Sequence, residues 1–124
     1  MIAKGLGKKQ WILPDCELPR EGDGVAKGHE SIIVVNDSGK DAHIIVKLFF
    51  TDKDPYTEIN WTVGAGRVRC FRMNNPDDMC DYIVPFETQY AMKLSSDQNI
   101  VVQYGRLDNT QANLAFYTTL GYSE

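Results

Sequence analysis

The segment SIIVVNDSGKDAHIIVKLFFTDKDPYTEINWTV, residues 31–63, decides the fold class. Short runs of β-branched and aromatic residues, at 31–35, 42–51 and 56–63, are separated by turn-forming clusters at 36–39 and 52–55. This pattern is typical of a β-sandwich or barrel. In the first turn, NDSG, Asn and Gly accept positive φ at little cost, so we expect a hairpin between the strands that flank it.

The run at 56–63 alternates apolar and polar residues. Ile59, Trp61 and Val63 fall on one side of an extended strand, and Asn60 and Thr62 fall on the other, because successive side chains of a strand point to opposite faces. The alternation predicts a strand with one buried face and one solvated face.

Further strands are predicted on both sides of this segment. Downstream they cover 67–73, 90–94 and 99–104, the last two joined by Ser-Ser-Asp at 95–97; upstream, a short strand at 11–13 precedes a long arm. Residues 112–120 suit a short helix or a last strand, and Tyr117, Thr118 and Thr119 favour the strand. Seven to nine strands and almost no helix predict one all-β domain over residues 1–124, an antiparallel β-sandwich of jelly-roll type.

Composition narrows the classes of partner and location. The chain has 124 residues, and its 13 basic against 17 acidic residues give a net charge of −4, which disfavours nucleic acid as a partner. Its longest aliphatic run, 32–35, is too short for a membrane helix, and no apolar stretch of signal-peptide length follows the N-terminal lysines. Cys16, Cys70 and Cys80 lack metal or redox spacing and are expected to be reduced thiols. These features predict a cytoplasmic protein.

Familiar motifs of catalysis and cofactor binding are absent from the sequence. Gly-Ala-Gly at 64–66 lacks the further glycine of a dinucleotide fingerprint, and two histidines, His29 and His43, are too few for a three-histidine metal centre within one chain. The acidic cluster within 74–81 is expected to be an ordinary polar loop rather than a calcium site. The sequence therefore predicts no enzyme, no cofactor and no metal.

Several polar residues stand at unusual places in the β pattern. His29 and Glu30 come just before the first long strand, where an exposed acid and an imidazole could bind a ligand hydroxyl or cap one another; a solvated strand start is the alternative. Arg67 and Arg72 lie in one arginine-rich run, where a solvated face is the common explanation.

Another group surrounds the strand at 99–104. Gln103 and Arg106 flank Tyr104 near the end of this strand, and polar planar side chains beside aromatic rings suit a sugar-binding cleft. Alternatively, Arg106 braces the turn at Asp108 through its carboxylate. Trp11 is either a core residue or the stacking ring of such a site, and the core assignment is favoured.

One ordered set of residues extends over almost the entire chain, and its spacing from His29 to Asn74 is unbroken. Its members are Trp11, Pro19, His29-Glu30, Asn36, Asp41-Ala42-His43, Asp52-Lys53-Asp54-Pro55, Thr62-Val63, Arg67, Arg72, Asn74, Val101-Val102-Gln103, Arg106-Leu107-Asp108 and Gln111. This set resembles the sensory rhodopsin transducer family. Gly64-Ala65-Gly66 and Thr110 depart from the family pattern.

The resemblance implies a β-sandwich that assembles as a ring-like homotetramer and acts as a signalling module for a small molecule or sugar. Coupling to a rhodopsin would be one specialisation of that role. The ligand-binding positions carried over from the family pattern are Trp11, His29, Glu30, Arg67, Arg72, Gln103, Arg106 and Asp108.

Three functions follow as expectations. The first is a non-enzymatic cytoplasmic binding module that recognises a small polar ligand, with a carbohydrate as the leading class. The second is a soluble transducer that docks on the cytoplasmic face of a membrane photoreceptor. The third and weakest is a sugar-cleaving enzyme that uses Glu30 and an aspartate as paired carboxylates.

Overall fold

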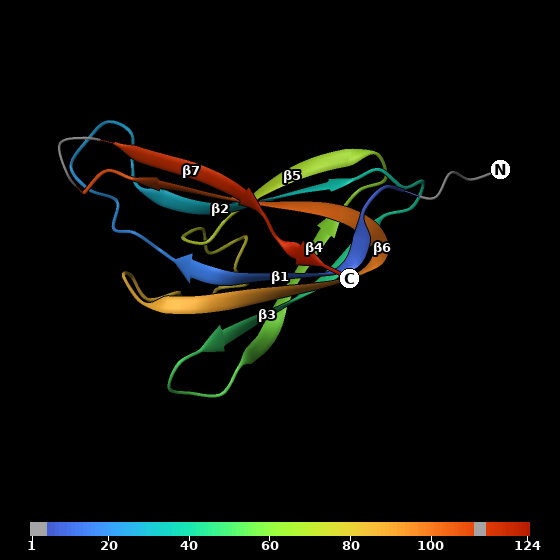
Figure 1. Ribbon diagram of the computed structural model, residues 1–124, viewed down its shortest axis with the longest axis horizontal. Helices are drawn as coiled ribbons and strands as arrows, with labels where there is room; N and C mark the ends of the chain where they lie inside the picture. Colours follow the sequence, from blue (N-terminus) through green and yellow to red (C-terminus); the bar gives the residue numbers. More distant parts are fainter. Residues whose placement is uncertain (1–4, 111–113) are drawn as a thin grey trace.

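The computed structural model describes residues 5–110 and 114–124, and Figure 1 shows an all-β arrangement. No helix occurs in these two ranges, so none of the described residues forms a helix that could cross a membrane. The strands are β1 (Lys8–Glu17), β2 (His29–Asn36), β3 (Ala42–Phe50), β4 (Tyr56–Val63), β5 (Arg67–Arg72), β6 (Gln89–Asp108), β7 (Ala115–Leu120) and β8 (Tyr122–Ser123).

The strands form two antiparallel layers that share β6. The first sheet has the order β4-β3-β6-β1-β8 and uses the first half of β6. The second sheet has the order β5-β2-β6-β7 and uses the second half. The predicted antiparallel sandwich is confirmed, and β7 settles the choice at 112–120 in favour of a strand, with 112 and 113 outside the described residues.

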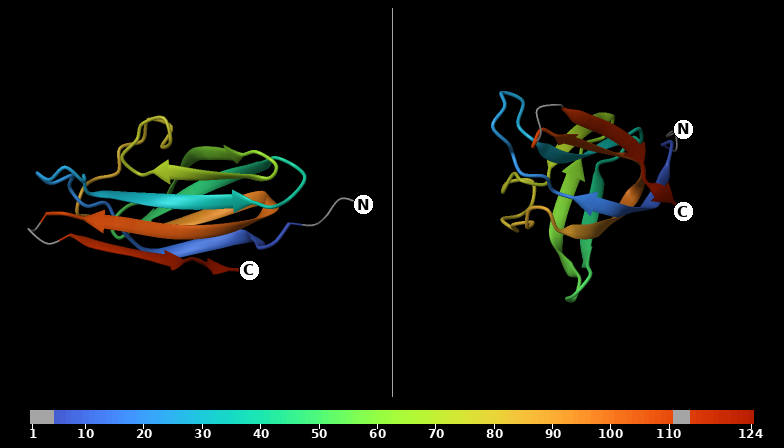
Figure 2. Two further views of the ribbon diagram at one scale, coloured as in Figure 1. Left: turned by 90° about the horizontal axis from the view of Figure 1, so that it is seen from above. Right: turned by 60° about the vertical axis from the view of Figure 1, so that its left-hand side comes forward.

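The strands predicted at 90–94 and 99–104 are one continuous strand of 20 residues, so the expected break at 95–97 is wrong. Ser95 and Ser96 stay in the ladder, opposite Gln10 of β1 and Ile44 of β3. After them the strand bends around one end of the molecule and returns in the other layer, as the long orange ribbon in Figures 1 and 2 shows. Hydrogen bonding to neighbours on both sides keeps these polar residues extended where their composition favours a turn.

The turn at 36–39 does not form the expected hairpin. β2 pairs with β5 and β6, whereas β3 pairs with β4 and β6, so this turn carries the chain from one sheet to the other. The buried Asn36 organises it: its Nδ2 donates to the carbonyls of Lys40 (2.7 Å), Val63 (3.0 Å) and Gly64 (3.2 Å), and its Oδ1 accepts from Ser38. One side chain therefore ties together the two short inter-sheet links, β2–β3 and β4–β5.

The core lies between the layers and follows the period-2 pattern. As predicted, Ile59, Trp61 and Val63 are buried. Trp61 stacks on Phe71 of the opposite sheet, with ring centroids 4.0 Å apart and planes 3° from parallel. The polar loop at 74–81 is fastened by Asp78, whose carbonyl accepts from the Trp61 indole at 2.6 Å and whose carboxylate accepts from the backbone N–H of Arg72 at 2.8 Å.

Replacing Asn36 tests its role as the brace of both inter-sheet links. Asn36→Ala removes the Nδ2 donor from the carbonyls of Val63 and Gly64 and leaves the Lys40 carbonyl with only the Ser38 hydroxyl. We therefore expect a loss of about 2–4 kcal/mol in the free energy of unfolding, measured by urea denaturation. Asn60→Ala, on the exposed face of β4, is the matched control and should change stability by less than about 0.5 kcal/mol. Equal effects of the two substitutions would contradict the assignment.

Candidate functional site

Glu30 lies completely buried between the two sheets, so the expectation of an exposed acid is wrong. Its Oε1 accepts a hydrogen bond from the hydroxyl of Tyr90, in the first-sheet half of β6. Its Oε2 accepts from the hydroxyl of Tyr104, in the second-sheet half, and from the backbone N–H of Glu17 in β1 at 2.9 Å. We call these four residues the Glu30 cluster; it joins both layers through a single carboxylate.

Strand alternation places these side chains. Glu30 shares the inner face of β2 with Ile32 and Val34, both fully buried. Tyr90 and Tyr104 have the same parity on β6 and both face inward, and the bend of β6 brings them to the same end of the sandwich although they are 14 positions apart. β2 begins at His29, two residues earlier than predicted. Extending the alternation of Ile32 and Val34 back to residue 30 places Glu30 on the buried face of the strand.

Burial dominates the electrostatics of the cluster. It raises the pKa of the Glu30 carboxyl above its ordinary value of 4.5, against the opposing effect of the two tyrosine hydroxyls, the Glu17 amide and the nearby Arg106. Burial, with the charge of Glu30, likewise raises the pKa values of Tyr90 and Tyr104, so both phenols stay protonated and able to donate. Burial also raises the pKa of the neighbouring Cys16 thiol, which makes it a poor nucleophile.

Arg106 lies beside this cluster on the inner face of the second sheet. It lies directly opposite Glu30 in the β2–β6 ladder, its Nη1 donates to the carbonyl of Glu17 at 3.3 Å, and its guanidinium carbon lies 5.0 Å from the ring centroid of Tyr117. The Asp108 carboxylate is engaged differently. It accepts from the backbone N–H and the hydroxyl of Thr110, and these hydrogen bonds hold the pKa of Asp108 below its ordinary value.

The remaining predicted site residues lie outside the Glu30 cluster. The His29 ring bonds the Lys27 carbonyl at 2.9 Å, and Gln103 lies opposite Ile33 and Leu120. Arg67 and Arg72 are exposed at the two ends of β5.

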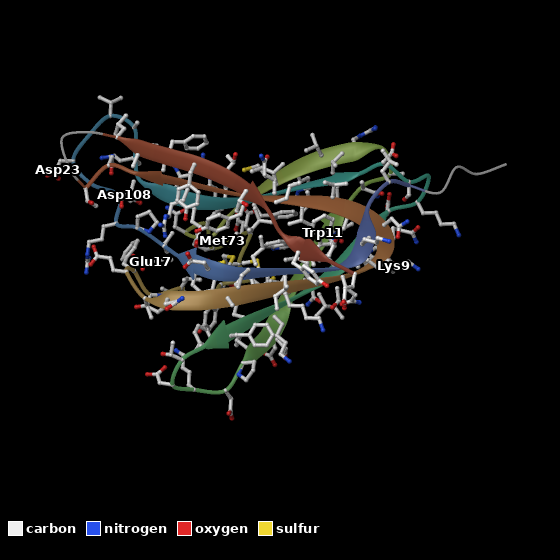
Figure 3. All side chains as sticks on the ribbon, viewed as in Figure 1. Lys9, Trp11, Glu17, Asp23, Met73 and Asp108 are labelled. Atoms are coloured by element: carbon white, nitrogen blue, oxygen red, sulfur yellow. The ribbon has the colours of Figure 1, made fainter. Side chains whose placement is uncertain are left out.

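Trp11 belongs to the core, as favoured from the sequence. It is 6% exposed, and its indole N–H donates to the carbonyls of Lys8 (2.9 Å) and Ile100 (3.0 Å). Figure 3 shows it toward the opposite end of the molecule from Glu17 and Asp108. The small exposed part of Trp11 lines a surface hollow of the first sheet, together with Gln10 and Tyr122.

The predicted set of eight residues therefore does not form one pocket. The structure brings Glu30 and Arg106 together, with His29 and Asp108 at the same end of the ladder. The partners that sequence reasoning missed are Glu17, Tyr90 and Tyr117. The local sequence around these residues gave little indication of their role, because each of them reaches the cluster from a strand that is distant in the sequence.

A sequence profile for the Anabaena sensory rhodopsin transducer matches residues 6–123, almost the full length. The chain belongs to the Anabaena sensory rhodopsin transducer family. A solved structure of the Anabaena sensory rhodopsin transducer itself is similar to this family member, with a TM-score of 0.71, 27% identity, and coverage of 82% of this chain and 99% of that one.

A second solved structure, of Thermotoga maritima 1070, shares the fold of this transducer-family chain. Its TM-score is 0.84 at 24% identity, over 95% of this chain and 96% of that one. No curated protein sequence matches significantly.

The Glu30 cluster predicts a specific stability defect. Glu30→Gln leaves one acceptor oxygen for three donors, so we expect a loss of about 1–3 kcal/mol in the free energy of unfolding near neutral pH. Glu17→Gln is the matched control, because Glu17 contributes only backbone groups to the cluster.

The same pair of variants gives a pH signature. Because the pKa of Glu30 is raised on folding, the folded state binds the proton more tightly, and this contribution to stability is complete below pH 4.5 and declines as pH rises through the folded-state pKa. The stability advantage of wild type over Glu30→Gln should therefore shrink as pH rises above 4.5, in urea titrations at a series of pH values. An advantage that grows with pH over this range would contradict the assignment.

Proposed function

We propose that this protein is a non-enzymatic cytoplasmic signalling module that acts as the soluble partner of a membrane sensory rhodopsin. The observation that carries the proposal is its likeness to the Anabaena sensory rhodopsin transducer, which extends over 99% of that chain at 27% identity. The family assignment over residues 6–123 supports the same function. Both carboxylate oxygens of Glu30 accept hydrogen bonds from protein groups inside the core, which favours a structural role for this acid over a catalytic one.

The outer face of the second sheet supplies a suitable surface for a protein partner. Val68 on β5 is 62% exposed, and Val35 on β2 is 39% exposed. By strand alternation and register, the outward positions of β5, β2, β6 and β7 include no Asp or Glu, although the whole chain is acidic. The outward positions also include the exposed Arg72 at the end of β5, so the face combines apolar side chains with one guanidinium and no carboxylate. Its apolar part costs little to desolvate on docking.

Receptor binding is tested by co-purification with the sensory rhodopsin encoded in the same genome. Val68→Glu places a charge on the proposed face and should reduce recovery of the complex at least about tenfold, as expected for a desolvated charge. Ile45→Glu, at a 55% exposed position on the outer face of the first sheet, is the control and should leave recovery unchanged. Absence of a rhodopsin gene from the genome, or equal recovery of both variants, would overturn the proposal.

Homotetramer formation is the second part of the proposal. In the part of the chain that the structure describes, β7 pairs only with β6, and every one of its six residues is exposed, Phe116 to 66%. A free edge strand with apolar side chains is a template for pairing with another copy of the chain.

Light scattering at micromolar protein measures this assembly. We expect a particle of four chains for wild type, and a smaller one for Phe116→Glu/Leu120→Glu. The Val68→Glu variant, altered at the far edge of the same sheet, should keep the wild-type mass. A 14.0 kDa wild-type particle would refute the tetramer.

Recognition of a small polar ligand is a second candidate function. It is favoured by a hollow of about 440 Å³ beside Trp11, which combines aromatic and hydrogen-bonding side chains. Ligand binding by the eight residues chosen from the sequence stays a prediction.

A further inference from the structure

The connection between β5 and β6 carries an apolar groove. Residues 73–88 form this connection, the yellow loop that projects from the strands in Figure 2. The loop is joined to the end of β1, because Phe86 forms an isolated parallel bridge with Leu18 and the Glu87 N–H donates to the Leu18 carbonyl at 2.8 Å. The groove has a volume of about 380 Å³. Eight of its ten lining residues are apolar or aromatic, and the other two are Asn74 and Asp81.

The groove has a buried floor and an exposed rim. On the floor, Leu18 and Met73 are each 1% exposed and Val84 is 3% exposed. On the rim, Ile83 is 85% exposed and Phe86 is 41% exposed. A single apolar side chain from another molecule can pack on this floor beside Ile83, which removes apolar surface of both molecules from water.

The loop that forms the groove is the most one-sided part of the chain in charge. Residues 73–88 contain four acidic residues and no Lys, Arg or His, so their charge of −4 equals the net charge of the whole chain. The four are Asp77, Asp78, Asp81 and Glu87. Arg72 precedes the loop, but its side chain lies on the outer face of the second sheet.

Ion pairs compensate only two of these carboxylates. Asp78 lies 3.7 Å from Arg69, and Glu87 lies 3.3 Å from Arg20. The other two, of which Asp81 lines the groove, form no ion pair within residues 5–110 and 114–124. The groove therefore combines an apolar floor with carboxylates that can pair with cations of a partner.

Two cations lie near the groove, and neither of them pairs with Asp81 in the part of the chain that the structure describes. The guanidinium carbon of Arg20 lies 5.5 Å from the ring centroid of Phe86. The Lys53 ammonium lies 4.4 Å from the ring centroid of Phe50, which does not line the groove. The contact of Arg20 with Phe86 shows that the rim suits a cation as well as an apolar group.

The backbone around the groove is strained. Cys80, Asp81 and Glu87 have φ values of 50°, 65° and 54°, and they are the only residues other than glycine with positive φ in the described ranges. This conformation is unfavourable for residues that carry a Cβ, and such residues cluster at binding sites. Two of the three are acids of the loop, so the strain sets the positions of their carboxylates.

We propose that this groove binds a segment of a protein partner in which one apolar side chain is flanked by Lys or Arg residues. The apolar side chain packs on the floor beside Ile83, and the flanking cations pair with Asp81 and Asp77. Charge complementarity selects a basic segment, because the loop offers uncompensated carboxylates and no cation of its own. The site goes beyond the proposed receptor function, whose surface on the outer face of the second sheet shares no residue with the groove.

The proposal is tested by phage display of random dodecapeptides on the immobilised full chain. The enriched peptides should contain an aliphatic or aromatic residue flanked by at least two Lys or Arg residues. The most enriched peptide, synthesised with a fluorescein label, is then measured by fluorescence anisotropy, and added NaCl should weaken its binding.

Two substitutions at exposed positions separate the apolar and the charged contacts. Ile83→Ser should weaken binding of the labelled peptide about tenfold, and Asp81→Asn should weaken it severalfold. Asparagine tolerates the positive φ at position 81, so the second variant keeps the loop conformation. The matched controls are Ile45→Ser, on the outer face of the first sheet, and Asp37→Asn, in the turn after β2; both should bind like wild type.

Three results would overturn the proposal: no peptide enriched over an uncoated surface, enriched peptides without basic residues, or equal affinities of Ile83→Ser and Ile45→Ser. The receptor proposal has a different readout, the effect of Val68→Glu on co-purification, and Val68→Glu should bind the labelled peptide like wild type. Failure of either proposal therefore leaves the other one intact.

Discussion

The buried carboxylate of Glu30 is the constraint on which the inner arrangement of this sandwich depends. A fully buried carboxylate needs donors for both oxygens, and these come from β1 and from the two halves of β6. Supplying them fixes the distance between the layers, the inward rotation of Tyr90 and Tyr104, and the position of the end of β1. The aliphatic residues around Glu30 pack without directional bonds, whereas the hydrogen bonds of the Glu30 cluster require one relative position of β1, β2 and β6.

Local periodicity was sufficient to predict the fold class and the buried face of β4, because alternation at 59, 61 and 63 is a property of a single strand. Pairing between distant segments was not predictable in this way. Residues 95–97 have the composition of a turn, yet they continue the strand, and the turn at 36–39 links two sheets because β2 finds its partners elsewhere in the chain. The site followed the same rule: Glu30 and Arg106 were identified, but Tyr90 and Glu17 joined them only through long-range packing.

The two outer faces differ in chemistry, and the difference divides the proposed functions between them. The second sheet presents exposed valine side chains and the Arg72 guanidinium without carboxylates, which suits a protein surface. The first sheet presents the hollow beside Trp11, which is lined by aromatic, amide, ammonium and carboxylate side chains. Family membership supports the proposed protein partner, and the hollow supports the second candidate function.

The bend of β6 and the links braced by Asn36 lie toward one end of the sandwich, whereas the Glu30 cluster lies toward the other. Short connections join the two sheets at the end with the β6 bend. At the other end the loops are longer, and the Glu30 carboxylate bonds to both sheets. The two sheets are therefore linked covalently at one end, and at the other end they are linked by the hydrogen bonds of Glu30. We expect the sheets to separate first at the end that holds the Glu30 cluster. Backbone amides should exchange with solvent progressively more slowly from that end towards the end with the β6 bend.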